Sequence, residues 1–423
     1  MTPQSMTHKI FARQAGRDHV ESGEFIEARI NMSFTHDPGI AVLTETFYNG
    51  FGQDAKVWDP SRVALFQDHL VPAKDPASRN LVKIMDEFAA AQGIQHYFPY
   101  GPNYGVSHTV LIEQGLTLPG ELLVGNDSHT VTGGAFNALA TGVGIVDMAA
   151  VLKTGRLWFS VPEVMQVSIN GRLQPNVQAM DIMLRLLSDI KMGGASGKAI
   201  EWAGSTIDDL TLDQRTSLCN MVVEGGAMNG IMTLTPEVEK FLSEVAQRPY
   251  EPVTPDPDFE YERVVSYQAE DIEPMIALPH KPDNGVPLSE VVGKGIKVDQ
   301  VYVGGCAGGK FEDIKIFADV VRGNRIAKGI QVVVVPATMS VYRAMTVQGI
   351  TQDLVMAGVN VESPGCKACF GAHGAVLGDG DVCLATINRN FRGRMGSPNA
   401  SVYLASSMTA GHTALHGYIT DGK

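Results

Sequence analysis

The stretch QVYVGGCAGGKFEDIKIFADVVRGNRIAKGIQVVVVPATMSVYRAMTVQGITQDLVMAGVNVESPGCKACFG, residues 300–371, decides the fold class. Apolar runs open the segments 300–309, 329–337 and 359–371, and helical patterns occupy 311–324 and 340–358 between them. Alternation of strand and helix predicts a parallel sheet covered by helices. We therefore expect an α/β fold in the last third of the chain.

The first 160 residues show the same order of strand, polar loop and helix. The apolar run 63–66 leads into a polar loop and then into an amphipathic helix from Asp75 to Gln92. The apolar run 121–124 leads into a loop of hydrogen-bonding residues and glycines. Because α/β folds carry their functional groups at the carboxyl ends of strands, we expect functional side chains in these two loops.

Two features divide the chain into three predicted α/β domains. The segment VPEVMQVSINGRL, residues 161–173, is typical of an antiparallel hairpin that turns at Asn170 and Gly171. Eight prolines between residues 249 and 287 indicate a crossing between domains. The predicted domains are residues 1–162, 163–280 and 281–423.

Composition excludes several classes of protein. The 423 residues carry a net charge of −13, which argues against nucleic acid or an anionic membrane as a main partner. No stretch is apolar enough to span a bilayer, and the amino terminus has no apolar run behind its basic residues, so we expect a cytoplasmic protein. Five cysteines are too few, and odd in number, for a disulfide framework.

Three of the cysteines lie in glycine-containing turns. Cys366 and Cys369 form a C-x-x-C turn, and Cys306 follows an apolar run in the segment GGCAGG. Three thiolates from two strand ends suit an iron–sulfur cluster with one open corner, whereas structural zinc requires four protein ligands. A redox pair, a zinc site and no chemistry at all are the alternatives for C-x-x-C alone. Cys219 and Cys383 are expected to pack in the core.

A phosphate-binding loop is a rival interpretation of the first cysteine segment. Residues 304–310 match the pattern G-x-x-x-x-G-K and follow a strand. The next residue is Phe311, where Mg²⁺ binding requires Ser or Thr. The missing hydroxyl weakens the nucleotide interpretation.

Histidines in strand-end loops are acid–base candidates. His69 follows Asp68, His129 lies two residues after Asp127, and His108 lies in the loop segment 105–108 near an apolar run. Imidazole changes charge near neutral pH, and a carboxylate partner sets its tautomer. A single such histidine is usually solvated or structural, but three in this arrangement favour a site.

An arginine-rich loop follows the last part of the predicted sheet. The segment NRNFRGR, residues 388–394, contains Arg389, Arg392 and Arg394. Guanidinium groups bind carboxylates in a bidentate manner, although a solvated basic loop is the simpler alternative. Beside a candidate metal site in an acidic protein, this loop favours a small polycarboxylate as the ligand.

Taken together, these motifs resemble the aconitase superfamily, and most closely its branch of isopropylmalate dehydratase large subunits. The resemblance runs nearly end to end. It rests on ARQAGRDHVESGEF (12–25), QDHLVP (67–72), GVSHTVLIEQGLTLPGELLVGNDSHTVTGGAFNALATGVG (105–144), RTSLCNMVVEGGA (215–227), SPGCKACFG (363–371) and NRNFRGRMG (388–396).

The resemblance implies a fold and a set of site residues. It implies three α/β/α domains around one 4Fe-4S cluster that is held by Cys306, Cys366 and Cys369 and has one open iron. Implied acid–base pairs are Asp68 with His69, Asp127 with His108, and Glu224 with His129. Implied substrate contacts are Ser128, Asn220, Asn388, Arg389 and Arg394.

The implied activity is that of a hydro-lyase. It reversibly dehydrates and rehydrates a hydroxy-dicarboxylate, most closely the interconversion of 3-isopropylmalate and 2-isopropylmalate in leucine biosynthesis. Homoaconitase and a dehydratase of a methylated malate (citraconate type) are alternatives. A non-catalytic cluster-sensing or RNA-binding homologue is an alternative of another class, which the negative charge disfavours. Because no segment matches the family's swivel domain, we expect a separate small subunit, in a heterodimer or heterotetramer.

Two segments depart from the family pattern. The family usually has S-C-T-N-G-R around the first cysteine, where this chain has GGCAGGK at residues 304–310. The loop at residues 34–39 lacks the glutamine found there in aconitase. Both departures lie where the family selects its substrates.

Overall fold

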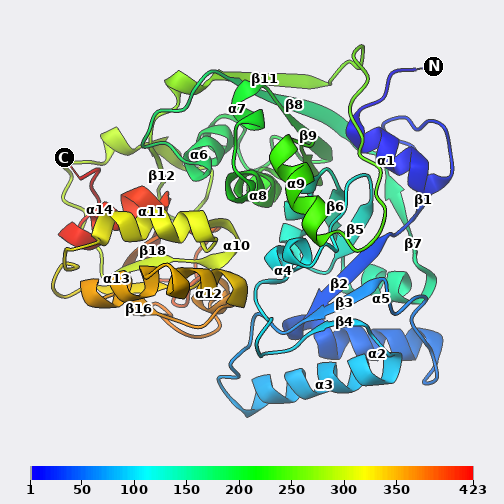
Figure 1. Ribbon diagram of the computed structural model, residues 1–423, viewed down its shortest axis with the longest axis horizontal. Helices are drawn as coiled ribbons and strands as arrows, with labels where there is room; N and C mark the ends of the chain where they lie inside the picture. Colours follow the sequence, from blue (N-terminus) through cyan, green and yellow to red (C-terminus); the bar gives the residue numbers. More distant parts are fainter. Residues whose placement is uncertain (1, 423) are drawn as a thin grey trace. The chain divides into compact units, whose positions relative to one another are not determined.

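The computed structural model describes residues 2–422 (Figure 1). The chain forms two compact units: the first contains Met1–Gly101, Ser107–Asn170 and Ala195–Tyr267, and the second contains Pro102–Val106, Gly171–Gly194 and Gln268–Lys423. Both units combine parallel strands with helices, so the α/β class expected from the sequence is confirmed. The division into three domains stays a prediction.

The first unit is built on a sheet of five parallel strands in the order β4-β3-β2-β5-β6. The strands of the first unit as a whole are β1 (Phe25–Arg29), β2 (Met32–His36), β3 (Val63–Phe66), β4 (His96–Phe98), β5 (Leu122–Gly125), β6 (Leu139–Gly142), β7 (Arg156–Ser160), β8 (Glu163–Asn170), β9 (Lys198–Ala203), β10 (Asn229–Ile231) and β11 (Arg263–Gln268). Its helices are α1 (Met6–Ala15), α2 (Ile40–Phe51), α3 (Pro76–Gln92), α4 (Ser107–Glu113), α5 (Ile145–Thr154), α7 (Ser205–Asp208), α8 (Leu212–Met221) and α9 (Pro236–Val245), with 3₁₀ turns η1 (Asp37–Gly39), η2 (Ser128–Phe136) and η3 (Val222–Gly225).

Both faces of the five-stranded sheet are buried, as expected for parallel strands. Along β3, Val63 and Leu65 pack with α2, α3 and α5, whereas Ala64 and Phe66 pack with α4. Figure 1 shows α2 and α3 on one side of β2–β4 and α4 on the other. The alternation of side chains explains why continuous apolar runs form these strands.

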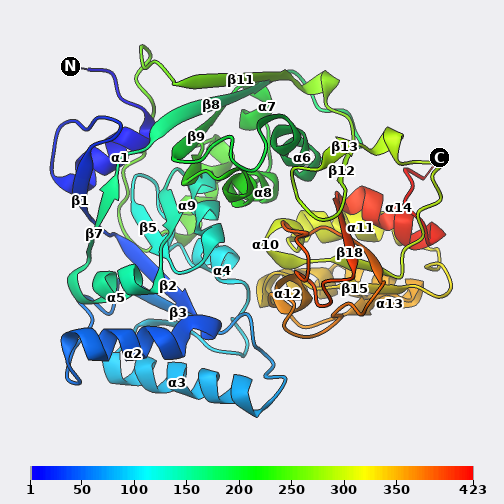
Figure 2. The ribbon, with the colours of Figure 1, turned by 180° about the vertical axis from the view of Figure 1, so that it is seen from behind.

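A second sheet of the first unit has the order β10-β9-β8-β11, and Figure 2 shows β11 along the outer edge beside β8. The antiparallel hairpin expected at residues 161–173 is wrong: β8 ends at Asn170, no strand follows directly after it in the described chain, and its neighbour β9 in the sheet is parallel to it. The chain turns at Gly171, which has a φ of 96°. The residues that follow do not pair with β8, because the amide N–H of Arg172 and the side chain of Gln174 donate hydrogen bonds to Glu270.

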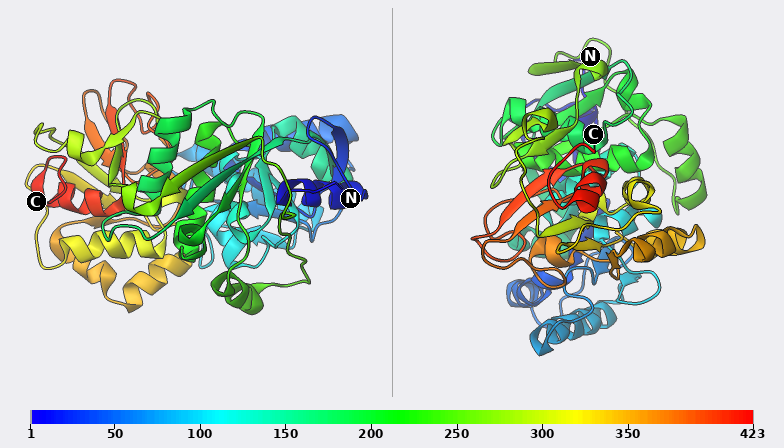
Figure 3. Two further views of the ribbon diagram at one scale, coloured as in Figure 1. Left: turned by 90° about the horizontal axis from the view of Figure 1, so that it is seen from above. Right: turned by 90° about the vertical axis from the view of Figure 1, so that its left-hand side faces the viewer.

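The second unit contains a seven-stranded sheet in the order β13-β12-β18-β17-β14-β15-β16. Its strands are β12 (Met275–Ala277), β13 (Gly285–Pro287), β14 (Gln300–Val303), β15 (Gln331–Val334), β16 (Asn360–Val361), β17 (Val382–Ala385) and β18 (Ser401–Ala405). Its helices are α6 (Ala179–Ile190), α10 (Gly305–Gly308), α11 (Phe311–Val321), α12 (Met339–Val347), α13 (Ile350–Ala357) and α14 (Ser407–His416), with 3₁₀ turns η4 (Ala269–Asp271), η5 (Leu288–Glu290) and η6 (Lys367–Phe370). Helices α11–α14 share one apolar core with β14 and β15, and the yellow-to-orange helices of residues 311–357 can be followed in Figure 3.

The parallel parts of the two sheets have the same topology. In each, the first strand is central, the next two lie on one side of it and the last two on the other. Strand order therefore reverses between β2 and β5, and between β14 and β17. Loops diverge at such switch points, so ligands of α/β proteins bind there.

No helix among the described residues is long and apolar enough to cross a membrane.

Asn137 is the C-cap of η2, the 3₁₀ turn that follows Asp127, and its contacts allow the stability of this part of the fold to be tested. Its backbone has a φ of 60°, and its buried side chain donates to the carbonyls of Met232 and Val253 and accepts from the amide of Val253 at 2.8 Å. Asn137→Ala strains the left-handed backbone and leaves these groups unpaired, so we expect a loss of about 3 kcal/mol in unfolding free energy, measured by urea denaturation. Asn137→Gly removes the same hydrogen bonds, but glycine adopts the left-handed backbone without strain, so it should lower the unfolding free energy by less than Asn137→Ala. If Asn137→Ala lowered it by the same amount or by less, backbone strain would not contribute at this position.

Candidate active site

In the first unit, acid–base side chains gather at the carboxyl ends of β2, β3 and β5. Strand β2 ends at His36, Asp68 and His69 follow β3, and Asp127 follows β5 as the N-cap of η2. Because these strands are neighbours and parallel, their carboxyl ends meet at one edge of the sheet. The sequence separates these residues by up to about 90 positions, and the sheet brings them together.

Asp37 organises the turn after β3. Its buried carboxylate accepts backbone N–H bonds from Asp68 at 3.2 Å, His69 at 3.0 Å and Leu70 at 2.7 Å. Burial, followed by the charge of Asp68, raises the pKa of Asp37 to about 6. Asp37 and His36 were not among the predicted site residues, although they stand at the carboxyl end of a strand, where Asp68 and His69 also lie.

Asp68 and His69 form a tight buried pair. The Oδ1 atom of Asp68 lies 2.6 Å from Nδ1 of His69, and Oδ2 accepts the backbone N–H of Ser107 at 2.9 Å. Burial opposes both charges, but their mutual attraction outweighs it: the pKa of Asp68 falls to about 2 and that of His69 rises to about 9. His69 is therefore an imidazolium at neutral pH and is able to donate a proton.

Asp127 lies at the centre of the histidines. Its Oδ1 is 3.2 Å from Nε2 of His108, and its Oδ2 is 3.5 Å from Nε2 of His36 and 3.8 Å from Nε2 of His69. The same carboxylate caps η2 by accepting the backbone N–H of His129 at 2.7 Å. Burial disfavours its charge, but His108 and then His129 outweigh burial and hold the pKa of Asp127 well below its usual value.

The third predicted pair also forms. Nε2 of His129 lies 3.0 Å from Oε1 of Glu224, which η3 supplies. The contacts implied for Asp68 with His69, Asp127 with His108 and Glu224 with His129 are thus present, while their catalytic roles stay predictions. Asn220 is fully buried, and its amide donates to the hydroxyl of Thr132 at 2.8 Å, which attaches α8 to η2.

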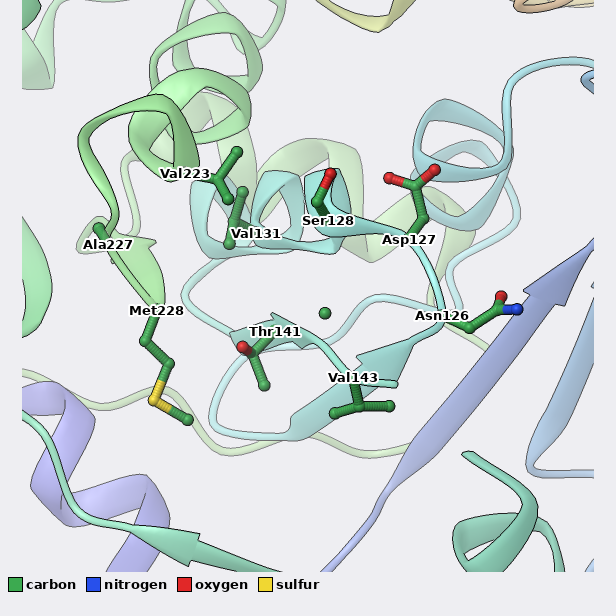
Figure 4. Close-up of a pocket in the computed structure, with 10 residues that line it drawn as sticks. Asn126, Asp127, Ser128, Val131, Thr141, Val143, Val223, Ala227 and Met228 are labelled. Atoms are coloured by element: carbon green, nitrogen blue, oxygen red, sulfur yellow. The ribbon is translucent and has the colours of Figure 1, made fainter. Parts of the chain in front are cut away.

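A pocket of about 430 Å³ lies beside this group (Figure 4). It is lined by Asn126, Asp127, Ser128, Val131, Thr141, Gly142, Val143, Val223, Ala227 and Met228. Figure 4 shows the Asp127 carboxylate and the Ser128 hydroxyl on one side, with Thr141 and Val143 on the other. The Ser128 hydroxyl lies 3.4 Å from Nδ1 of His129.

Ligand-type atoms of His36, His69 and Asp127 lie within 4.8 Å of one another, which is close enough for a metal ion. Metal binding needs neutral imidazoles. Burial and the charge of His69 lower the pKa of His36 to about 4, so His36 meets this need, but the raised pKa of His69 does not.

In the second unit, the three predicted cysteines gather near the switch point between β14 and β17. Cys306 and Cys366 share a small buried cluster with Val106 and Ala337. The side-chain amide of Asn388, after β17, donates to Sγ of Cys306 at 3.2 Å, and its oxygen lies 4.0 Å from Sγ of Cys369. One amide therefore contacts two of the proposed ligands.

The cysteine loop explains the departure from S-C-T-N-G-R. Gly305 has a φ of 77°, which strains any other residue, and a Cβ there would lie 3.2 Å from Sγ of Cys369. At Gly308 a Cβ would lie 2.2 Å from Oγ1 of Thr386, whose hydroxyl already accepts from the amide of Gly304 at 3.1 Å. Serine and asparagine at these two positions do not fit this backbone.

Arg394 brings positive charge to the cysteines. Burial opposes its charge, but the thiols of Cys369, Cys366 and Cys306 outweigh burial and raise the pKa of Arg394. Its guanidinium also lies 5.8 Å from the ring centre of Phe370. Arg389 lies in the same loop and is half-buried, whereas Arg392 is exposed.

The donor set of the second unit fits an iron–sulfur cluster. Three buried thiols, glycine-lined loops, an amide donor to sulfur and a nearby arginine suit a soft, anionic group. Cys219 and Cys383 are fully buried elsewhere, and burial raises the pKa of both thiols, which suits packing. Residues 2–422 contain no disulfide. The phosphate-loop interpretation is disfavoured, because the ammonium of Lys310 contacts the carbonyl of Ala307 and the carboxylate of Asp313.

Buried histidine–carboxylate pairs at the switch point of one sheet, and three gathered thiols near that of the other, are typical of α/β enzymes that depend on a metal centre. Residues 49–417 match the aconitase family (aconitate hydratase). The chain belongs to the aconitase family, as its motifs predicted.

Relatives cover nearly the whole chain. It is 40% identical over 415 residues to the 3-isopropylmalate dehydratase large subunit of Halothermothrix orenii, which covers 98% of both chains. It is 40% identical over 419 residues to large subunit 1 of the same enzyme from Methanopyrus kandleri, covering 99% of both. It is also 42% identical over 396 residues to a probable methanogen homoaconitase large subunit of Methanosarcina mazei, covering 94% of this chain and 99% of the relative.

The Asp68–His69 pair predicts a pH-dependent stability. Because the pKa of His69 is about 9 in the folded chain and near 6.5 when unfolded, its protonation stabilises the fold below pH 6.5, and this contribution is lost as pH rises through 9. The shift corresponds to about 3 kcal/mol. Asp68→Asn should therefore lower the urea unfolding free energy most at pH 6.5 and progressively less towards pH 9.

The surface pair of Lys315 and Asp319 provides the control. Asp319→Asn breaks two half-exposed ion pairs, one with Lys315 and one with Arg322. Both cations stay charged between pH 6.5 and 9, so the small effect of this variant on the unfolding free energy should not change over that range. If the unfolding free energy of Asp68→Asn differed from that of the wild-type chain by the same amount from pH 6.5 to pH 9, His69 would not be held as an imidazolium.

Proposed function

We propose that this chain is the cluster-bearing large subunit of an iron–sulfur hydro-lyase that interconverts 3-isopropylmalate and 2-isopropylmalate. The observation that carries the proposal is the joint occurrence of a buried imidazolium, His69, with three gathered cysteines, Cys306, Cys366 and Cys369. Relatives named as dehydratase large subunits support it.

The three cysteines would hold a 4Fe-4S cluster. When bound, its open iron supplies a Lewis acid for the hydroxyl group and a carboxylate of the substrate. Arg394, whose charge the thiols favour, and Arg389 in the same loop then bind carboxylates of the substrate. Asn388 donates to Cys306 and so helps to set the direction of its thiol.

The acid–base group of the first unit handles protons. His69 donates its Nε2 proton to the departing hydroxyl, and Asp68 holds the ring by Nδ1 and favours its charged form. Asp127 orients His108, and Glu224 orients His129. Ser128 and Asn220 are further proposed substrate contacts.

A separate small subunit would complete the enzyme. The relatives are named as large subunits. We propose that the small subunit supplies the base that removes the proton from the carbon next to the departing hydroxyl, and that it pairs with this chain in a heterodimer or heterotetramer. The chain alone would bind a cluster but would not turn over substrate.

Homoaconitase is the second candidate function, because one relative with that name is 42% identical. The two candidates differ in the substrate, which carries an apolar branch in one and a third carboxylate in the other. A panel of unsaturated dicarboxylates and tricarboxylates, hydrated by the co-expressed subunits without oxygen, distinguishes them. Turnover of only the tricarboxylate would overturn the main proposal.

Cys366→Ser should abolish cluster assembly while leaving most of the fold intact, because a serine hydroxyl is a harder and weaker ligand for cluster iron than a cysteine thiolate. Iron and sulfide are counted after anaerobic purification, and circular dichroism reports the fold. Cys383→Ala is the matched control, since Cys383 lies in β17 with no proposed role in ligation. Full iron content in Cys366→Ser would remove Cys366 from the ligand set.

His69→Ala should bind substrate but dehydrate it roughly 100-fold more slowly, because it lacks the proton donor. The measurement is kcat with the small subunit present, alongside KM. His416→Ala, which alters an exposed histidine of α14, should behave as the wild type. An unchanged kcat in His69→Ala would remove His69 from the acid role.

A further inference from the structure

Each of the two cysteine loops contains a buried lysine. Lys310 lies four residues after Cys306, and Lys367 directly follows Cys366. Both lysines are only 2% exposed, and lysine is almost never buried to that degree unless its charge is paired. Neither residue has a role in the proposed chemistry.

Lys367 closes the loop around Cys366. Its ammonium lies 2.9 Å from Oε2 of Glu362 and donates to the Ser363 hydroxyl at 2.9 Å. Glu362 is itself attached to the sheet, because its amide donates to the carbonyl of Val334 in β15 at 2.9 Å. The lysine thus connects the cysteine turn to the end of the sheet, and it does so from a left-handed backbone with a φ of 45°.

Lys310 makes the corresponding connection for Cys306. Its ammonium contacts the carbonyl of Ala307, the residue after Cys306, and lies 3.0 Å from Oδ2 of Asp313. Asp313 belongs to the first turn of α11, so the lysine attaches the cysteine loop to that helix. The carboxylate of Glu362 is paired in the same way, and Lys367 is the main reason that the pKa of Glu362 is lowered.

We propose that Lys310 and Lys367 are positioning residues that hold the cysteines in a ligating arrangement before the cluster is inserted. This inference rests on the iron–sulfur part of the proposed function. Both loops are rich in glycine, so they would lose considerable conformational entropy on closing around a cluster. The lysines fix the loops in advance. Because each ammonium is neutralised by its own carboxylate, the lysines act by position more than by charge.

The test is reconstitution of the purified chain with ferrous iron and sulfide in the absence of oxygen. Lys367→Met should slow the growth of the visible cluster absorbance and weaken iron retention in air by roughly 10-fold. Lys310→Met should do the same. Lys315→Met breaks an exposed ion pair on α11 and is the matched control, with assembly at the wild-type rate.

Two further variants separate position from charge. Lys367→Arg keeps a cation within reach of Glu362 and should restore assembly. Lys367→Met combined with Glu362→Gln removes both charges, and should keep the defect if the lysine acts by position. Recovery of the wild-type rate in the double variant would show that an unpaired Glu362 caused the defect, and would overturn the proposal.

A milder variant keeps the test decisive if Lys367→Met does not fold. Ser363→Ala removes one of the two bonds of Lys367, and should give a smaller defect in iron retention with unchanged circular dichroism. Wild-type assembly in Ser363→Ala, Lys310→Met and Lys367→Met would refute the positioning role while leaving the cluster intact. A wild-type chain that assembles no cluster would instead refute the proposed function and this inference with it.

Discussion

Parallel pairing around a central strand is the constraint on which the rest of the structure depends. β2 pairs with β3 and β5, and β14 pairs with β15 and β17, so strand order reverses beside each central strand. Side chains that follow these strands necessarily meet at one edge of each sheet. The acid–base group is a direct product of this topology. In the cysteine group, Cys306 follows β14 and Asn388 follows β17, and the long loop after β16 brings Cys366 and Cys369 to the same place.

Burying so many ionisable groups requires specific compensation in each unit. In the acid–base group, backbone amides stabilise Asp37, and the histidines stabilise Asp68 and Asp127. The result is one imidazolium of raised pKa, His69, beside a neutral imidazole, His36. Neighbouring titratable groups whose pKa values are pushed apart are characteristic of sites that move protons.

The cysteine group is compensated in a different way. An amide from Asn388 and a guanidinium from Arg394 lie against the thiols, while Lys310 and Lys367 attach the loops to α11 and to the end of the sheet. The missing side chains at Gly305 and Gly308 are explained by backbone conformation and by Thr386. The packing of this loop therefore requires glycine at these two positions, where the family usually has Ser and Asn.

The sequence by itself determined the α/β class, the family and the three histidine–carboxylate pairs, because apolar periodicity and long motifs are local signals. β3 spans the predicted residues 63–66, and α3 ends at the predicted Gln92 but begins at Pro76, because Asp75 is its N-cap. Other features were decided only by tertiary structure. Asn170 and Gly171 form a turn but no hairpin, because the residues that follow donate hydrogen bonds to Glu270. His36 and Asp37 join the acid–base group through strand order, and buried lysines pair with carboxylates through loop folding, neither of which leaves a local pattern in the sequence.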